Sequence, residues 1–508
     1  MKLTLLNARL PGERGLMGSG INVVIRDGII DDIEFVGQTS AFTVPAAGGD
    51  SAVEAEQIVD LGGRFLIPGL WDNHVHMGQW AQTRRRLDLA RAESADHASA
   101  IVAENLALRA ANRDAGIAEP VIGFGWRGTL WDGEPHKDLL DRYTGATPVY
   151  LFSVDLHTVW VNSAGLLAQG IDHPTGILIE EECYALERRM QVVDVTTLDA
   201  WVAEAAREAA ARGVVGIVDF ELAWNPGDWR RRIQNGNDLL RVECGIYPEH
   251  LERAIETGLR TGDTVASTNG LLRVGRLKVI SDGSLGSRTA YCSVPYPAAT
   301  GARARGVLNI LPADLRVLME RAQSNGIESA IHAIGDNAVA LALDEFEHSD
   351  AEGAIEHAQL VSPADVERIA GLEIVASVQP EHAMDDRDAV DALWPAHAAW
   401  AFSLASMLEA GVELAFGSDA PVTPLDPWRG IAAAVTRSRD GREPWHPEQC
   451  IDVEDALEAS TRSRLAIGQP ADLIALDIDP LECDGEQLRT MPVALTLVAG
   501  RVTHSTLS

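Results

Sequence analysis

Short apolar runs separated by turn residues mark both ends of the chain. Within residues 1–67 the runs LTLLNARL, INVVIRDG, IIDDIEFVG and IVDLGGRFLIPG alternate with Gly, Asp and Asn, which is typical of short antiparallel strands. The same pattern returns within residues 465–508, in PADLIALDIDP and MPVALTLVAGRVTHS. We therefore expect the two ends, 1–67 and 465–508, to form one composite β-sandwich domain.

Eight further apolar segments, rich in β-branched residues, lie between these ends, and each finishes in polar or ionisable residues. They are GLWDNHVH (69–76), GVVGIVDFE (213–221), LRVECGIYPEH (240–250), RLKVISDG (276–283), IESAIHAIGD (327–336), GAIEHAQLV (353–361), LEIVASVQPEH (372–382) and VELAFGSDAPV (412–422). Helical stretches such as TTLDAWVAEAAREAAARG (196–213) separate several of them. This α/β alternation, with chemistry at the strand ends, predicts a (β/α)8 TIM barrel over residues 68–464.

The spacing of the segments predicts an insertion after the first barrel strand. A barrel of roughly 250 residues gives about 31 residues for each strand and helix pair. From His332 to His357 is 25 residues, which is one pair, whereas His76 to Lys278 is 202 residues for three pairs. We expect the excess to form an inserted subdomain at about residues 80–195.

Composition narrows the class of protein. The formal net charge of −33 disfavours nucleic acid and anionic membranes as partners. No apolar run reaches the roughly 18 residues needed to span a bilayer, and Asn7, Arg9 and Pro11 interrupt the stretch where a signal peptide would need apolar residues. We expect a cytoplasmic enzyme acting on a small molecule, for which a homodimer is one option.

Histidines and one aspartate stand where a barrel carries its active site. His74 and His76 lie two residues apart, so in a strand both side chains point to the same face. His332, His357 and Asp419 each follow another apolar segment. Imidazole and carboxylate groups are the usual ligands of a catalytic divalent metal, and we expect one or two such ions, with zinc as the first candidate.

A series of motifs resembles the amidohydrolase superfamily, in particular the group of N-substituted formamide deformylases (amidohydrolase family 3). The motifs cover nearly the whole chain and comprise LIPGLWDNHVH, HTVWVNSAGL, PTGILIEE, LKVISDGSLGSRTA, IHAIGDNAV, IEHAQLV, SVQPEH, FGSDAPVTPLDPW and GQPADLIALD. One stretch, EASTRSRLAIGQPADL, is shorter than the family pattern.

The resemblance implies a role for each candidate residue. His74, His76 and Asp419 would bind one metal ion, and His332 with His357 a second. Lys278, carboxylated by CO2, would bridge the two ions. The chain has only three lysines, Lys2, Lys137 and Lys278, and arginine could replace a lysine needed only for charge but cannot form a carbamate. A plain salt bridge from Lys278 to Asp282 or Asp419 is the alternative.

The expected reaction is hydrolysis of a C–N bond in an N-substituted formamide, acyl amide or cyclic amide. A metal-activated hydroxide would attack the carbonyl group, with Asp419 as the general base. Two alternatives stay open: a deaminase of the same fold with one metal, and a metal- or ligand-binding protein without catalysis. Six residues are candidates for substrate binding: Trp126, His157, Asp282, Arg288, Gln379 and His382. Trp131 is a further candidate.

Overall fold

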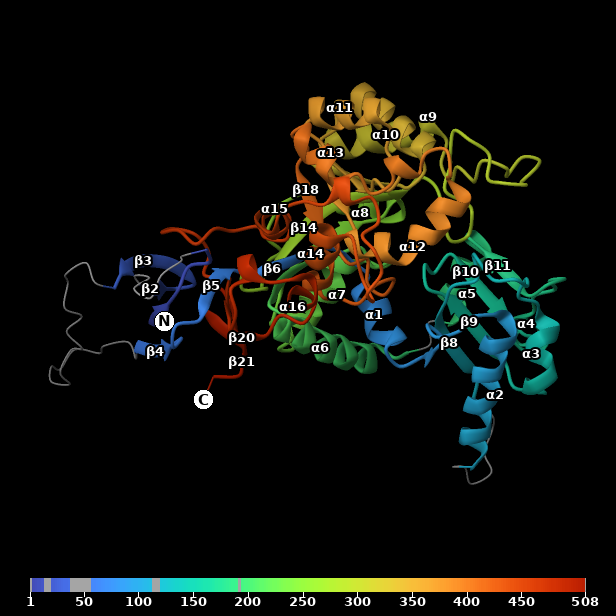
Figure 1. Cartoon of the computed structure of the whole chain (residues 1–508), viewed down its shortest axis with the longest axis horizontal. Helices are drawn as coiled ribbons and strands as arrows, with labels where there is room; N and C mark the ends of the chain where they lie inside the picture. The colour runs from blue at the N-terminus through green and yellow to red at the C-terminus, as the bar shows by residue number, and fades with distance from the viewer. Residues whose placement is uncertain (1, 13–19, 37–55, 112–118, 191–192, 508) are drawn as a thin grey trace.

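The computed structural model describes residues 2–12, 20–36, 56–111, 119–190 and 193–507 (Figure 1). Its central element is an eight-stranded parallel sheet whose strand order follows the chain. The strands are β6 (Leu70–Val75), β12 (Val214–Asp219), β13 (Arg241–Ile246), β14 (Leu272–Ile280), β15 (Ser329–Ala333), β16 (Gly353–His357), β17 (Val375–Val378) and β18 (Leu414–Phe416). Each lies within one of the eight predicted segments or overlaps it, so the barrel prediction is confirmed.

The sheet closes on itself just beyond β18. Val75 and Ala420 form a parallel bridge, and the Asn73 amide donates a hydrogen bond to the Phe416 carbonyl group at 2.9 Å. The Asp419 N–H group donates to the His74 carbonyl oxygen at 2.7 Å. This seam joins the first and last strands, and it carries His74 and Asp419 to the same end of the barrel.

Helices follow the strands and cover the outside of the barrel. Several begin at a proline, which suits the first turn because its missing N–H group would have no partner there. Asp194 caps the start of α6, where its side chain accepts the Thr197 N–H group. The helices are α1 (Met77–Thr83), α6 (Val195–Ala211), α7 (Asn225–Gln234), α8 (Pro248–Glu256), α9 (Pro312–Gln323), α10 (Asp336–Ser349), α11 (Pro363–Gly371), α12 (Pro380–Leu393), α13 (Leu404–Glu409), α14 (Pro427–Thr436), α15 (Val453–Glu458) and α16 (Gly485–Arg489), with 3-10 turns at Ala398–Trp400, Pro447–Gln449 and Pro480–Glu482.

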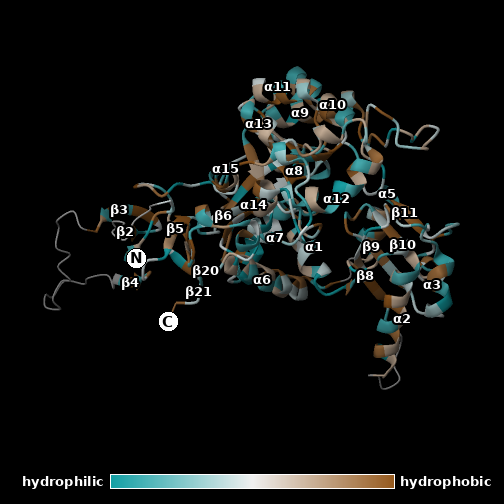
Figure 2. Cartoon of the chain, viewed as in Figure 1, coloured by the Kyte–Doolittle hydropathy of each residue, from teal (hydrophilic) through white to brown (hydrophobic). Residues whose placement is uncertain are grey.

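Two four-stranded sheets pack together where the chain ends meet, with the blue N-terminal and red C-terminal strands side by side in Figure 1. Leu3, Leu5 and Val23 of one sheet share a buried core with Leu473 and Leu495 of the other. In Figure 2 the short strand β5 is largely apolar. The strands, in sheet order, are β3 (Ile29–Phe35), β2 (Ile21–Arg26), β1 (Lys2–Ala8) and β4 (Glu56–Asp60), then β21 (Arg501–Ser505), β20 (Val493–Val498), β19 (Leu473–Leu476) and β5 (Phe65–Pro68).

A five-stranded sheet with its own helices lies between α1 and α6 in the chain, where the insertion was predicted. Figure 1 shows it on the opposite side of the barrel from the chain ends. Its elements are β7 (Leu87–Asp88), β8 (Val121–Trp126), β9 (Val149–Ser153), β10 (Thr158–Val161) and β11 (Ile177–Ile179), with α2 (Ala95–Ala111), α3 (Lys137–Thr144), α4 (Ser163–Gln169) and α5 (Glu181–Met190). We call this unit the insert. The exact domain boundaries proposed above stay a prediction.

The helices of the described ranges include none that combines the length and the apolar character needed to cross a bilayer.

Candidate active site

A cavity of about 490 Å³ lies between the carboxyl ends of the barrel strands and the insert. Histidines and Asp419 line its barrel side, while Trp126, Trp131 and His157 line its insert side. Enzymes with this fold place their chemistry at the carboxyl ends of the strands. The cavity therefore joins the predicted metal ligands to several of the predicted substrate contacts.

His74, His76 and Asp419 converge at the barrel seam. Nε2 of His74 and Nε2 of His76 each lie 3.5 Å from Oδ1 of Asp419. One ligand atom from each of the three residues lies within 4.8 Å of the other two. Period-two alternation along β6 brings both histidines to this face, and the seam brings Asp419.

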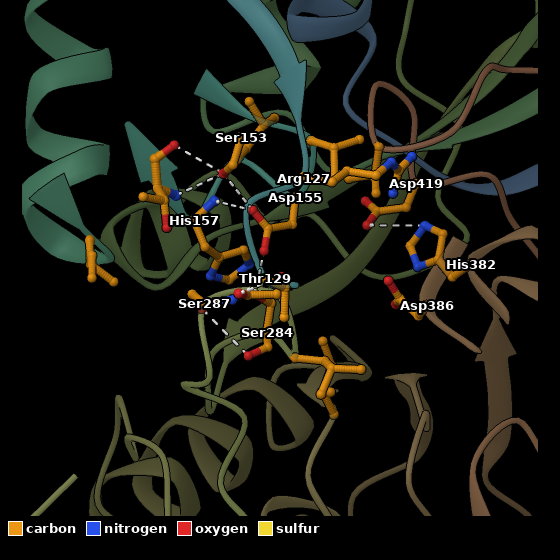
Figure 3. Close-up of a pocket in the computed structure, with 18 of the residues that line it drawn as sticks. Arg127, Thr129, Ser153, Asp155, His157, Ser284, Ser287, His382, Asp386 and Asp419 are labelled. Carbon is orange, nitrogen blue, oxygen red and sulfur yellow. Dashed lines mark hydrogen bonds and ion pairs between the residues drawn. The ribbon is translucent and has the colours of Figure 1, made fainter. Parts of the chain in front are cut away.

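A second group combines His357, His382 and Asp419, again with ligand atoms within 4.8 Å of one another. His332 stands beside it, its ring centroid 4.4 Å from that of His357, and its Nε2 lies 3.5 Å from Asp282 Oδ1. The resemblance pairs His332 with His357, whereas the geometry groups His382 with His357 and Asp419. The His382 Nε2 lies 4.0 Å from Asp419 Oδ2 (Figure 3).

The backbone is strained at two of these positions. His357 has φ 73° and Asp419 has φ 55°, in the left-handed region that residues other than glycine seldom adopt. Strain of this kind persists where the surrounding structure enforces it, and it concentrates at functional sites. Two of the candidate ligands, His357 and Asp419, thus lie on strained backbone.

The buried histidine nitrogens fit a divalent ion. Nε2 of His332 and Nε2 of His382 are buried without a hydrogen-bond partner among the described residues, which is costly unless another group satisfies them. Burial, followed by the charge of Lys278, lowers the pKa of His74, and burial also lowers the pKa of His332. Neutral imidazole is the form that binds metal.

Lys278 lies at the centre of the barrel side of the cavity, with 1% of its surface exposed. Its Nζ is 3.3 Å from His74 Nε2 and 4.5 Å from the centre of the Phe220 ring. Burial lowers the pKa of Lys278 to about 8, although the carboxylates of Glu356 and Asp419 oppose this. Part of the Lys278 population therefore carries a neutral amine near neutral pH, and carbamate formation requires that form.

Sequence reasoning missed two buried carboxylates beside the predicted ligands. Glu356 Oε2 lies 2.6 Å from His74 Nδ1, and Asp72 Oδ1 accepts the Ser418 N–H group at 2.8 Å. Burial raises the pKa of Asp72 to about 7. Each was visible as an acidic residue beside a predicted ligand, in WDNHVH and IEHAQ. Carboxylates that orient ligating histidines are a recurrent part of metal sites.

The insert contributes a tightly bound histidine to the opposite side of the cavity. His157 Nδ1 lies 3.1 Å from both carboxylate oxygens of Glu180 and 2.8 Å from the Tyr184 hydroxyl group. Burial alone would lower the pKa of His157, but the charge and hydrogen bond of Glu180 outweigh it and raise the pKa to about 9. This imidazole is therefore charged at neutral pH.

The other candidate substrate contacts divide into two groups. Trp126 and His382 line the cavity, and so does Arg288, whose side chain donates to the Thr129 carbonyl group at 3.2 Å. Asp282 and Gln379 are not on its lining. The Asp282 carboxylate accepts backbone N–H groups of Tyr291, Ile334 and Gly335. The Gln379 side chain lies 2.8 Å from His357 Nδ1.

Known proteins match the chain along most of its length. A family model described as the amidohydrolase family matches residues 57–504. The protein LONG AFTER FAR-RED 3 of Arabidopsis thaliana is 28% identical over 454 residues, covering 82% of this chain and 75% of the relative. The N-substituted formamide deformylase of Arthrobacter pascens is 24% identical, covering 89% of this chain and 90% of the relative.

A solved structure has the same overall architecture. The crystal structure of an uncharacterized metal-dependent hydrolase from Pyrococcus horikoshii OT3 matches with a TM-score of 0.75 and 25% identity, over 96% of this chain and 99% of that chain. The family match covers far more than half of the chain, and the histidine and aspartate cluster stands at the strand ends. The chain therefore belongs to the amidohydrolase family and is a hydrolytic enzyme.

Proposed function

We propose that this enzyme hydrolyses a C–N bond of an amide-type small molecule, such as an N-substituted formamide, an acyl amide or a cyclic amide. The observation that carries the proposal is the convergence of His74, His76 and Asp419 at the end of a 490 Å³ cavity. The relative that is named as a formamide deformylase supports the bond type.

His74, His76 and Asp419 would hold one divalent ion, with zinc as the first candidate. His332 and His357 would hold a second, and His382 lies close enough to contribute. When bound, such an ion lowers the pKa of water and polarises a carbonyl group. Lys278 supports the two-ion form: its amine adds to CO2, releases one proton, and presents two carbamate oxygens. The described contacts of this amine are with His74 and Phe220 rather than with a carboxylate.

Asp419 is the residue to which we assign the proton transfers. Burial alone would raise its pKa, but His74, His76 and His357 outweigh this and hold the pKa of Asp419 well below its usual value. The carboxylate is therefore ionised and can accept the proton of the attacking water. It then delivers that proton to the departing amine nitrogen, while the acyl carbon keeps the new oxygen.

The size and lining of the cavity support a small-molecule substrate. Pockets of roughly 300–1,000 Å³ hold small molecules, with mostly apolar walls and few polar groups. Trp126 and Trp131 supply aromatic surface on the insert side, which suits an apolar substituent on the amide nitrogen. Location in the cytoplasm, and a homodimer as one option, stay predictions of the sequence.

A hydrolysis screen on metal-defined protein tests the proposal. Metal-free protein, reloaded with zinc or manganese, would be assayed against N-alkyl formamides, acyl amides, cyclic amides and ring amines, with acid and ammonia measured separately. We expect acid and amine from at least one amide, abolished by metal removal and restored by reloading. Ammonia from a ring amine as the only product would instead favour the deaminase, which uses a single ion.

A further inference from the structure

His157 lies in the turn between β9 and β10 of the insert and lines the cavity. Its ring centroid is 6.2 Å from that of His332, so the two rings are neighbours in the wall of the cavity. Nδ1 faces Glu180, at 3.1 Å from both carboxylate oxygens. Because Nε2 is on the other edge of the ring, it is the nitrogen left for a ligand in the cavity.

Glu180 is held by several hydroxyl donors, and this fixes where the protons are. Its carboxylate accepts hydrogen bonds from Tyr184 at 3.2 Å and Ser287 at 3.3 Å, and also from Thr289. Glu180 itself has φ 53°, in the left-handed region that residues other than glycine seldom adopt. An ionised carboxylate only accepts hydrogen bonds, so Nδ1 of His157 must carry a proton.

The barrel holds the same histidine from a second direction. Ser284 and Thr289 lie on the loop that follows β14, the strand of Lys278. The Ser284 hydroxyl group donates to Asp155 Oδ2 at 2.6 Å, and Asp155 Oδ1 accepts the backbone N–H group of His157 at 3.3 Å (Figure 3). His157 is thus fixed at the contact between insert and barrel, where a rigid donor keeps its direction during a reaction.

We propose that His157 is a catalytic residue that donates an Nε2–H hydrogen bond to the oxygen of the scissile acyl group, and that Glu180 is its positioning residue. The identity of that oxygen rests on the proposed amide hydrolysis. The charged imidazole would stabilise the negative charge that develops on the oxygen. Removing one such donor typically lowers kcat by about 10²- to 10³-fold.

A pair of neighbouring glutamates provides the test. Glu180→Gln removes the charge that holds the imidazolium, whereas Glu181→Gln makes the same change at a side chain that is 78% exposed and pairs with Arg188. With an amide found in the screen, we expect kcat of Glu180→Gln to fall about 10²-fold while KM changes less than about 3-fold. Glu181→Gln should match the wild type. Equal kcat in Glu180→Gln and wild type would overturn the assignment, as would a loss confined to KM.

Binding of acetate separates this inference from the proposed function, because it needs no turnover. Calorimetry on zinc-loaded protein should give an acetate Kd about 10-fold weaker in Glu180→Gln than in Glu181→Gln or wild type, as expected for one lost hydrogen bond to a charged group. His157→Phe, which keeps a ring of similar shape, should weaken binding at least as much. Zinc content should be equal in all four proteins.

The outcomes are distinct. If no amide is hydrolysed but acetate binds more weakly to Glu180→Gln than to wild type, the proposed function fails and the assignment of His157 as a hydrogen-bond donor stands. If acetate binds equally to wild type, Glu180→Gln and His157→Phe, the donor assignment is wrong, whatever the substrate is.

Discussion

The two sides of the cavity are built differently. On the barrel side, His74, His332 and Lys278 stand on strands of the parallel ladder, and His357 ends such a strand. On the insert side, His157 stands in a turn between β9 and β10, held by side-chain hydrogen bonds. Arg288, on the barrel loop after β14, donates a hydrogen bond to the Thr129 carbonyl group of the insert. Strand ends keep ligands in register, whereas turns and loops vary without cost to the core. Under the proposed function, the barrel would supply the bond-breaking chemistry and the insert much of the substrate choice.

Asp419→Asn should have the largest effect and act only on the barrel side. Asparagine keeps the shape of the side chain but cannot accept and return the proton, so we expect kcat to fall by about 10³-fold or more. Circular dichroism should show an unchanged fold. Turnover within 10-fold of the wild type would contradict the role of Asp419 as the base.

Lys278→Ala should come next. Loss of the bridging carbamate should lower activity about 10²-fold or more and reduce the bound metal to one ion or less. Short carboxylic acids should restore part of the activity, because they can place two oxygens in the vacated space. Lys278→Arg is the matched control for charge, and a fully active arginine variant would refute the carbamate.

Glu356→Gln tests whether the buried carboxylate behind His74 orients that ligand. The amide would keep the volume but lose the charged contact of 2.6 Å, so we expect metal affinity to fall about 10- to 100-fold. Competition with a chromogenic chelator measures this affinity. Glu352→Gln, an exposed position just before the same strand, should leave it unchanged, and equal affinity in both variants would exclude the orienting role.

The smallest expected effect is on the pH dependence of folding stability, through the ion pair of His157 with Glu180. The pKa of His157 is about 9 in the folded protein, compared with an ordinary value of 6.5. Its contribution to the free energy of unfolding is therefore complete below pH 6.5 and is lost as the pH rises through 9. The pKa of Glu180 is about 2 in the folded protein, compared with an ordinary value of 4.5. Its contribution to the free energy of unfolding is therefore complete above pH 4.5 and is lost as the pH falls through 2.

Denaturant unfolding of wild type and Glu180→Gln should therefore differ most between about pH 4.5 and 6.5. The difference should shrink toward pH 9. A difference that stays constant, or grows with pH, would show that the pair does not stabilise the fold in this way.

The barrel and the placement of the candidate ligands on it could be predicted because they depend on local patterns. Apolar runs with polar ends are a direct result of burial inside a parallel sheet, and the HxH pair needs only period-two alternation. For this reason His74 and His76 lie together as the sequence indicates. Asp419 reaches them because the barrel closes, which follows from the strand count.

The remaining contacts depend on long-range packing that no local pattern encodes. Glu356 and His357 are neighbours that alternation would place on opposite faces, yet Glu356 contacts His74 and His357 lines the cavity. The contact of Glu180 with Thr289 joins the insert to a barrel loop 109 residues away. Asp282 was expected to bind substrate, yet its carboxylate is occupied by backbone N–H groups.

Anomalous diffraction at the zinc absorption edge, from crystals of zinc-loaded protein grown with bicarbonate, tests the metal centre most directly. We expect a peak about 2.0–2.2 Å from His74, His76 and Asp419, a second beside His357, and added density on Lys278 between them. A zinc-replete crystal without a peak at His74, His76 and Asp419 would contradict the account.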